Sequence, residues 1–282
     1  MSKNGLNDKD YKTIVAQIVK EVYEDGLQPA VKETGKTLGL VPRLIRSLLL
    51  PLENWILNRE YSLRITEKLL EYKLNNYKPE EMENDLKAFV AVPAINALSY
   101  SIGDIDLLNM YANLLATSML KEDKWKIHPS FVEIIKQLSP DEARLLQVIA
   151  TMPCDNEYPL INLVMLKEDK DDEFSLTISS TKYYVLKNFT SLGEEVCEVF
   201  GNISSYIENL ARFNIIEINN DLTATKNNYL EIEKHRFVEE AKRNNALREG
   251  FHWECERFMF MITNFGRNFI SACVFGPKKK ES

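Results

Sequence analysis

Through the first half of the chain, apolar side chains recur every three to four residues, the spacing that gathers them on one face of a helix. Leu44, Leu48 and Ile56 show this spacing within one expected helix. Pro51 kinks or divides that helix, because proline removes a backbone donor. The expected helices span residues 8–24, 42–75, 80–100 and 104–120, and together they predict an N-terminal helical domain of residues 1–127.

Two short sequence motifs predict where further helices begin. Ser130 is followed by Glu133, and Ser139 is followed by Glu142, with Pro140 at the first helical position after the second serine. In such a capping box the serine oxygen accepts one free backbone N–H, and the glutamate side chain accepts another. The motifs predict helices at Phe131–Leu138 and Pro140–Ala150.

The C-terminal region repeats the element order of a winged-helix module: helix, strand, strand, helix. Between the two expected strands lies a long charged insertion, in the place that a wing occupies. The expected elements are a helix at Ile203–Phe213, a strand at Ile215–Ile218, charged helical sequence at 226–250, a strand at Phe258–Ile262 and a final helix capped by Thr263 or Asn264. We therefore predict a mostly α fold, in which a multi-helix region is followed by a winged-helix-like α+β domain of residues 128–282.

Length and charge limit the classes of function. The 282 residues are 45% hydrophobic, which suits two globular domains. The net charge is −7, and the excess acid lies in the C-terminal half, where residues 139–282 carry 17 basic and 23 acidic side chains. Because nucleic acid binding depends on neutralising phosphates, this charge disfavours DNA as a partner.

The four cysteines are scattered and include no C-x-x-C pair, so we expect neither a disulfide framework nor a zinc site. The first ten residues are polar and do not resemble a signal peptide. No uninterrupted apolar stretch reaches the ~18 residues of a membrane-spanning helix. We expect a cytoplasmic protein.

The sequence contains no motif that predicts catalysis. Gly35-Lys36-Thr37 lacks the first glycine of a phosphate-binding loop, because Ala30 stands in its place. His252 and Cys255 supply two metal ligands at most, and no pair of carboxylates has a spacing that suggests general acid–base work. We expect no enzyme activity, no cofactor, no metal and no small-molecule substrate.

A basic and apolar stretch at residues 35–57 leaves two interpretations open. It is either a surface that contacts a membrane or a protein partner, or an ordinary core helix with two solvated arginines. The side chains of the candidate surface are Arg43, Leu44, Arg46, Leu48, Leu49 and Trp55.

A second candidate surface, for nucleic acid or a protein partner, lies on the expected recognition helix and in the wing insertion. Arg212 is the single basic residue of that helix, and glutamates are interleaved among the basic residues of the insertion. Such a surface favours protein interaction or dimerisation over reading DNA. Its residues are Ser204, Ser205, Asn209, Arg212, Lys234, Arg236, Lys242 and Arg243.

Several blocks of sequence resemble the abortive-infection alpha family of bacteria and prophages. They are LLLPLENW (48–55), YANLLATSM (111–119), HPSFVEIIKQLSPDEARLL (128–146) and MITNFGRNFISACV (261–274). The resemblance implies phage defence, in which an infected cell stops growing or dies before phage matures. It implies no catalytic residue. We expect a non-enzymatic protein that self-associates or binds a protein partner, with membrane association on activation or DNA binding by a prophage regulator as alternatives.

Overall fold

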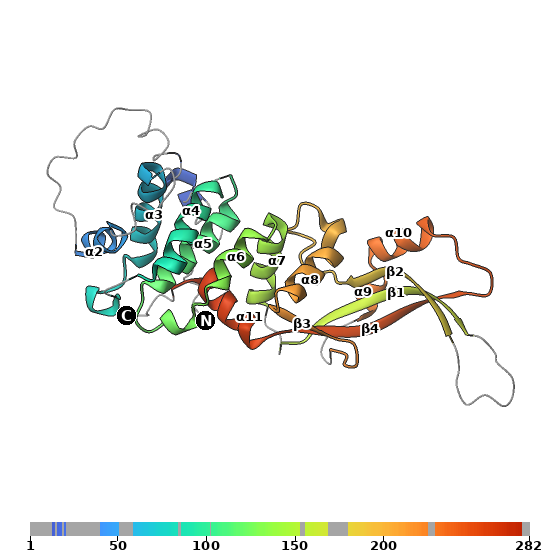
Figure 1. Cartoon of the computed structure of the whole chain (residues 1–282). Coiled ribbons are helices and arrows are strands. Elements are labelled where there is room, and N and C mark those ends of the chain that lie inside the picture. The colour runs from blue at the N-terminus through green and yellow to red at the C-terminus, as the bar shows by residue number, and fades with distance from the viewer. Residues whose placement is uncertain are drawn as a thin grey trace, which may run out of the picture. The chain divides into compact units, whose positions relative to one another are not determined.

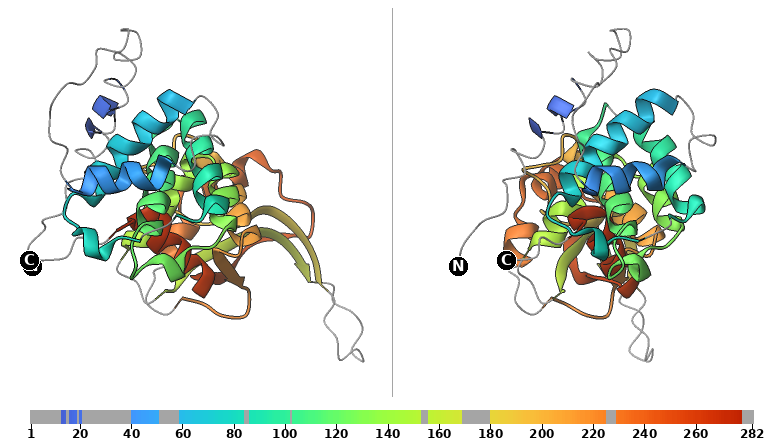
Figure 2. Two further views of the ribbon diagram at one scale, coloured as in Figure 1. Left: turned by 60° about the vertical axis from the view of Figure 1, so that its left-hand side comes forward. Right: turned by 90° about the vertical axis from the view of Figure 1, so that its left-hand side faces the viewer.

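A computed structural model describes most of the chain and shows a helical majority with one antiparallel sheet. About 57% of the described residues are helical, and the four described strands form an antiparallel, curled sheet (Figures 1 and 2). The fold class is therefore α+β, which confirms the mostly helical prediction in its coarse form. The described residues are 13–14, 16–18, 20, 40–50, 59–83, 86–101, 103–152, 156–168, 180–224 and 229–277.

Contacts divide these residues into two compact units. The helical unit contains the described residues up to Ala143 together with those from Asn268 on, and the sheet unit is Arg144–Arg267. The elements of the helical unit are α2 (Leu40–Leu49), α3 (Arg59–Leu74), η2 (Pro79–Glu81), α4 (Ala88–Tyr100), α5 (Ile105–Ser118), η3 (Lys124–Lys126), α6 (Ser130–Lys136) and the π-helix η5 (Ile270–Phe275), while α7 (Pro140–Thr151) and α11 (Asn264–Phe269) cross the division.

Helix α5 lies at the centre of the helical unit. It begins at a cap in which Asp104 Oδ1 accepts a hydrogen bond from the Leu107 N–H at 3.0 Å. The sequence predicts one apolar stripe along this helix, yet its side chains from Leu108 on are almost all buried. Because α3, α4, α6 and η5 all pack against α5, residues on every side of it enter the core.

The two predicted capping boxes have different outcomes. At Ser139, the box forms: Ser139 N–H donates to Glu142 Oε2 at 2.6 Å, and Glu142 N–H donates to Ser139 Oγ at 3.2 Å. The box at Ser130 is wrong, because α6 begins one residue earlier than expected and Ser130 lies inside it. There the Ser130 hydroxyl lies 2.6 Å from Nδ1 of His128, which also accepts the Ser130 N–H at 3.2 Å.

Several boundaries also differ from the sequence prediction. The expected helix at 80–100 begins only at Ala88, since Met82 pairs in a β-bridge with Leu120 instead. The break predicted at Pro51 lies outside the described residues, between α2 and α3. The described residues between 13 and 20 are helical, as expected, while the rest of the helix predicted at 8–24 lies outside the described residues.

The sheet unit is built on strand β1. The strand order is β2-β1-β4-β3, and every neighbouring pair is antiparallel. Register between β1 and β4 runs without a break from Tyr158↔Phe260 to Leu166↔His252. The elements are β1 (Tyr158–Glu168), β2 (Ser180–Phe189), η4 (Phe200–Asn202), α8 (Ile203–Arg212), β3 (Ile216–Asn219), α9 (Tyr229–Glu233), α10 (Arg236–Asn244) and β4 (His252–Ile262).

The winged-helix assignment is not confirmed. The two expected wing strands do pair, from Ile216↔Ile262 to Asn219↔Met259, and the described part of the insertion between them contains the helices α9 and α10. However, β4 begins at His252, before the expected strand at Phe258–Ile262, and it also pairs with the long strand β1. The apolar run of β1, buried from Tyr158 to Leu166 except at Asn162, forms the centre of a larger sheet instead.

A close approach fixes the start of α11. Thr263 caps this helix, as predicted, since its Oγ1 accepts the Gly266 N–H at 2.8 Å. The same hydroxyl donates to the Asn214 carbonyl at 2.6 Å. A Cβ at Gly266 would lie 1.9 Å from the Ile215 carbonyl oxygen, so only glycine fits at this crossing.

Candidate functional site

The most constrained group of polar side chains in the helical unit surrounds Lys73 of α3. This lysine is three and four residues from the buried Leu70 and Leu69, so it points to the apolar side of its helix. Its ammonium group donates to Oδ1 of Asn109 at 2.7 Å and to Oδ1 of Asn113 at 2.6 Å. Both asparagines lie on α5, one turn apart.

Burial changes the acid–base behaviour of this lysine. Removal of the ammonium group from water disfavours its charged form and lowers the pKa of Lys73 to about 7. The two amide oxygens that accept its hydrogen bonds carry no net charge, so they offset only part of the lost hydration.

Asn113 connects this lysine to the C-terminal π-helix. Its Nδ2 donates to the carbonyl oxygens of Cys273 and Val274, both at 2.9 Å. One turn further on, the Thr117 hydroxyl donates to the Asn113 carbonyl oxygen at 2.8 Å and also lies within 3.2 Å of the carbonyl oxygen of Ala272. The last carbonyls of η5 thus gain the side-chain donors that a helix end requires. Asn113 and Thr117 are themselves buried.

The chain also turns sharply at this point. Gly276 has a φ of +68°, and a Cβ there would lie 2.4 Å from Asn113 Oδ1, the atom that accepts the hydrogen bond from Lys73. A larger residue would displace the asparagine. We call Lys73, Asn109, Asn113, Thr117 and the carbonyls of Ala272–Val274 the lysine network.

Blocks that carry the family resemblance meet in and beside the lysine network. Asn113 and Thr117 belong to the block at 111–119, and their acceptors belong to the block at 261–274. The block at 128–146 supplies Phe131, whose ring packs edge-on against that of Phe269 at a centroid distance of 5.2 Å. Segments far apart in sequence are therefore held together by specific contacts.

The first predicted surface, on α2, divides between core and solvent. Leu48 and Leu49 are buried, as the core interpretation requires, and Leu44 is partly exposed. Arg43 and Arg46 are exposed. Trp55 lies outside the described residues, as do residues 35–39 and 51–58 of the same stretch.

The second predicted surface does not gather free positive charge on α8. Ser205 is exposed and Ser204 partly so. Asn209 Oδ1 accepts two hydrogen bonds from Arg212, at 3.0 and 2.7 Å, and the guanidinium also lies 4.4 Å from the ring centroid of Phe213. Arg212 is thus held against its own helix end.

In the insertion, two of the predicted basic residues are engaged in ion pairs. Arg236 lies 2.8 Å from Glu194, and Lys242 lies 2.8 Å from Glu239. Lys234 and Arg243 are exposed. These pairs reduce the positive charge that phosphates would need.

Glu194 anchors the start of α10. It accepts a hydrogen bond from Nε2 of His235 at 2.9 Å, and this bond, with the nearby charge of Arg236, lowers the pKa of the Glu194 carboxyl group. The other ring nitrogen of His235 accepts the N–H of Phe237 at 3.3 Å and so caps the helix. We interpret this cluster as structural.

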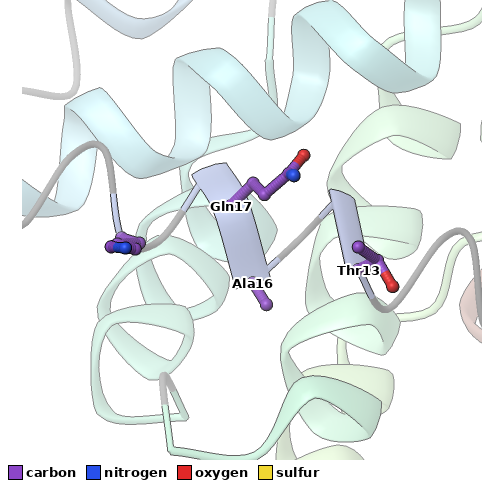
Figure 3. A pocket seen from close by; sticks show the side chains of 4 residues that line it. Thr13, Ala16 and Gln17 are labelled. Atoms are coloured by element: carbon purple, nitrogen blue, oxygen red, sulfur yellow. The ribbon is translucent and has the colours of Figure 1, made fainter.

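Cavities, metal ligands and membrane spans add no further site. A cavity of about 420 Å³ is lined by Thr13, Ala16, Gln17 and Lys20, of which one is ionisable (Figure 3). Within the described ranges, no three His, Cys, Asp or Glu side chains lie close enough to hold a metal ion. In the same part of the chain, no helix has the length and apolar character needed to cross a membrane.

The lysine network is not predicted from the sequence, because each of its residues is of a type that is common on helix surfaces. A lysine within a helix usually faces solvent, and asparagines are common on helix surfaces. The available signal was the position of Lys73 on the same face as Leu69 and Leu70.

Comparison with known proteins identifies the family. The family model described as abortive infection alpha matches residues 58–273, which is more than half of the chain. The chain belongs to the abortive infection alpha family. Comparisons with curated proteins and with solved structures find no match. The lysine network and both units lie largely within the part of the chain that matches abortive infection alpha.

Proposed function

We propose that this protein defends a bacterial cell against phage by abortive infection. The observation that carries the proposal is the family match over residues 58–273. In this form of defence, an infected cell stops growing or dies before phage matures, so neighbouring cells are spared. The match includes the residues of the lysine network, from Lys73 to Cys273.

The proposed mode of action is binding to another protein rather than catalysis. Exposed aromatic side chains support this mode, because tyrosine and arginine are enriched where proteins meet. On β2, Tyr183 and Tyr184 are 40% and 46% exposed, and Arg248 lies 3.8 Å from the ring centroid of Tyr183. The lysine network has a different role in this proposal: it holds the helical unit together.

A phage challenge tests the proposal. Cells that express the protein are infected at low and at high multiplicity, and both plaque number and culture survival are scored. We expect fewer plaques at low multiplicity and collapse of the culture at high multiplicity. Survival of the infected culture with fewer plaques would instead indicate defence that spares the infected cell, and unchanged plaque numbers across a broad phage panel would oppose a defence role.

One variant tests whether Lys73 has a structural role or takes part in the activity. Lys73→Met removes the amine while keeping an unbranched side chain of similar length, so the helical unit should fold. If Lys73 is structural, this variant protects cells as the wild type does, provided that its circular dichroism spectrum and expression level are unchanged. Loss of protection by a folded Lys73→Met protein would show that the amine itself takes part in the activity. Lys136→Met, at an exposed lysine, is the matched control.

A further inference from the structure

The outer edge of strand β2 is the least enclosed part of the sheet. β2 stands at one end of the strand order, so among the described strands it pairs with β1 alone (Figure 1). The edge spans Ser180–Phe189, and such a long edge presents backbone N–H and C=O groups to an incoming strand. Near its end, α8 packs on β2, and Asn188 Nδ2 donates to Glu208 at 3.1 Å. Helix α10 also packs against β2, and the side chains of residues 182–184 and 187 are exposed.

The charges along this edge are basic. Ser180–Phe189 contains Lys182 and Lys187 and no acidic residue, although the whole chain has a net charge of −7. Lys182 forms an ion pair with Glu256 of β4 at 2.6 Å, which raises the pKa of Lys182. Its positive charge is thus partly balanced from within the sheet. Lys187 lies over the ring of Tyr184, 4.6 Å from its centroid.

The two exposed tyrosines are held in place by their neighbours. Tyr183 lies between the guanidinium of Arg248 and the ring of Phe251, whose centroid is 5.5 Å from its own. Tyr184 is covered on one side by Lys187. A partner that binds here gains aromatic contact at little additional cost in side-chain entropy, since these rings are already positioned.

From this arrangement we propose that the β2 edge binds an extended, acidic segment of another protein, which adds to the sheet as a fifth strand. Backbone hydrogen bonds to residues 182–187 supply the pairing, and acidic side chains of the segment face Lys187 and Arg248. Strand addition explains why an open edge, fixed aromatic rings and positive charge occur together. The proposal concerns binding alone and does not depend on the role in abortive infection.

A second copy of the chain fits this edge poorly. If two β2 strands paired antiparallel along their full length, Ser180 would face Phe189, and Lys182 of each strand would face Lys187 of the other. Like charges directly opposite one another destabilise a strand pair. The excess of acidic residues in each copy adds to the repulsion. Charge complementarity therefore favours an acidic segment from a different protein.

The test uses a bead-bound library of random decapeptides, selected on the full-length protein at physiological salt. We expect selected peptides to be enriched in Asp and Glu and poor in Pro, which cannot donate to the strand ladder. Selection on a Lys187→Glu variant should abolish the acidic enrichment. Selection on Lys234→Glu, which reverses an exposed charge elsewhere in the sheet unit, should leave it unchanged.

Affinity measurements on the best selected peptide then decide the mode of binding. We expect Lys187→Glu to weaken the peptide at least tenfold, and methylation of alternate backbone nitrogens of the peptide to do the same. Equal binding of the methylated peptide would show charge attraction without strand addition and would overturn the proposal. Selected peptides without acidic enrichment would overturn it as well. So would tighter binding of a thymidine oligonucleotide or of anionic phosphatidylserine vesicles, each abolished by Lys187→Glu.

Discussion

Replacement of Lys73 by methionine should change how the stability of the protein depends on pH. The pKa of this lysine is about 7 in the folded protein, compared with 10.5 for a lysine side chain in water, the value that applies to the unfolded chain. The unfolded chain therefore holds the proton more tightly between these values, so protonation favours unfolding. The resulting penalty is largest below pH 7 and is relieved as the pH rises from 7 towards 10.5.

The size of this effect follows from the two pKa values. Each pKa unit corresponds to about 1.36 kcal/mol, so the free energy of unfolding of the wild type should rise by roughly 1.6 kcal/mol between pH 7 and pH 8.5 from this group alone. Lys73→Met lacks the group and so lacks this rise. The difference in unfolding free energy between the two proteins should therefore change by the same amount over this interval.

Urea denaturation followed by circular dichroism at 222 nm measures this difference. The other ionisable groups are common to both proteins, so their contributions cancel in the comparison. Lys136→Met, at a lysine whose side chain is 66% exposed, should show no pH-dependent difference from the wild type. A difference for Lys73→Met that stays constant within about 0.5 kcal/mol would refute the reasoning, because the ammonium group would then be as well solvated in the folded protein as in water.

Three further substitutions test packing, capping and the lysine network. Gly266→Ala places a Cβ against a backbone carbonyl at 1.9 Å and should lower the free energy of unfolding by about 2–3 kcal/mol in urea titrations, whereas Gly103→Ala, with open space around it, should not destabilise the protein. An unchanged free energy of unfolding for Gly266→Ala would contradict the close approach of Gly266 to the Ile215 carbonyl. Ser139→Ala should lower the urea midpoint by an amount equivalent to about 1 kcal/mol, because the Ser139 hydroxyl caps α7. Ser130→Ala should lower it by less than half of that, because Ser130 lies inside α6 and does not cap it. Asn113→Ala removes the donor to two carbonyls of the π-helix and should speed amide hydrogen exchange in the C-terminal peptide at least tenfold, as measured by mass spectrometry; unchanged exchange would show that other contacts hold this segment.

The sequence predicted helices well where their signals are local. Asp104, Ser139 and Thr263 each cap a helix through atoms within three residues of themselves, so their roles follow from short-range geometry. Ser130 has the same motif as Ser139, but the ring of His128 competes for its hydroxyl. The sequence shows that His128 is nearby, but only the three-dimensional structure shows that its ring nitrogen contacts the Ser130 hydroxyl.

The larger sheet could not be predicted for a different reason. The pairing of β1 with β4 joins Tyr158 to Phe260, and nothing in either strand specifies so distant a partner. Winged-helix order in the last part of the chain was consistent with β3 and β4, yet it was silent about β1 and β2. The order of elements in the last part of the chain therefore could not predict that β1 and β2 belong to the same sheet.

The lysine network could not be predicted because its bonds cross the whole chain. Lys73 and Asn113 are 40 residues apart, and Asn113 and Cys273 are 160 residues apart. The placement of Lys73 on an apolar face indicated burial, but it did not indicate the two asparagines that accept its hydrogen bonds.

The interleaving of the two units in the sequence has a consequence for the timing of activity during protein synthesis. Asn113 leaves the ribosome 160 residues before the carbonyl of Cys273 that it binds. At ordinary bacterial rates of translation this delay is roughly 8–30 s. During that time the sheet unit, Arg144–Arg267, is synthesised in full, while the helical unit still lacks its π-helix. The helical unit therefore cannot be completed on a nascent or truncated chain.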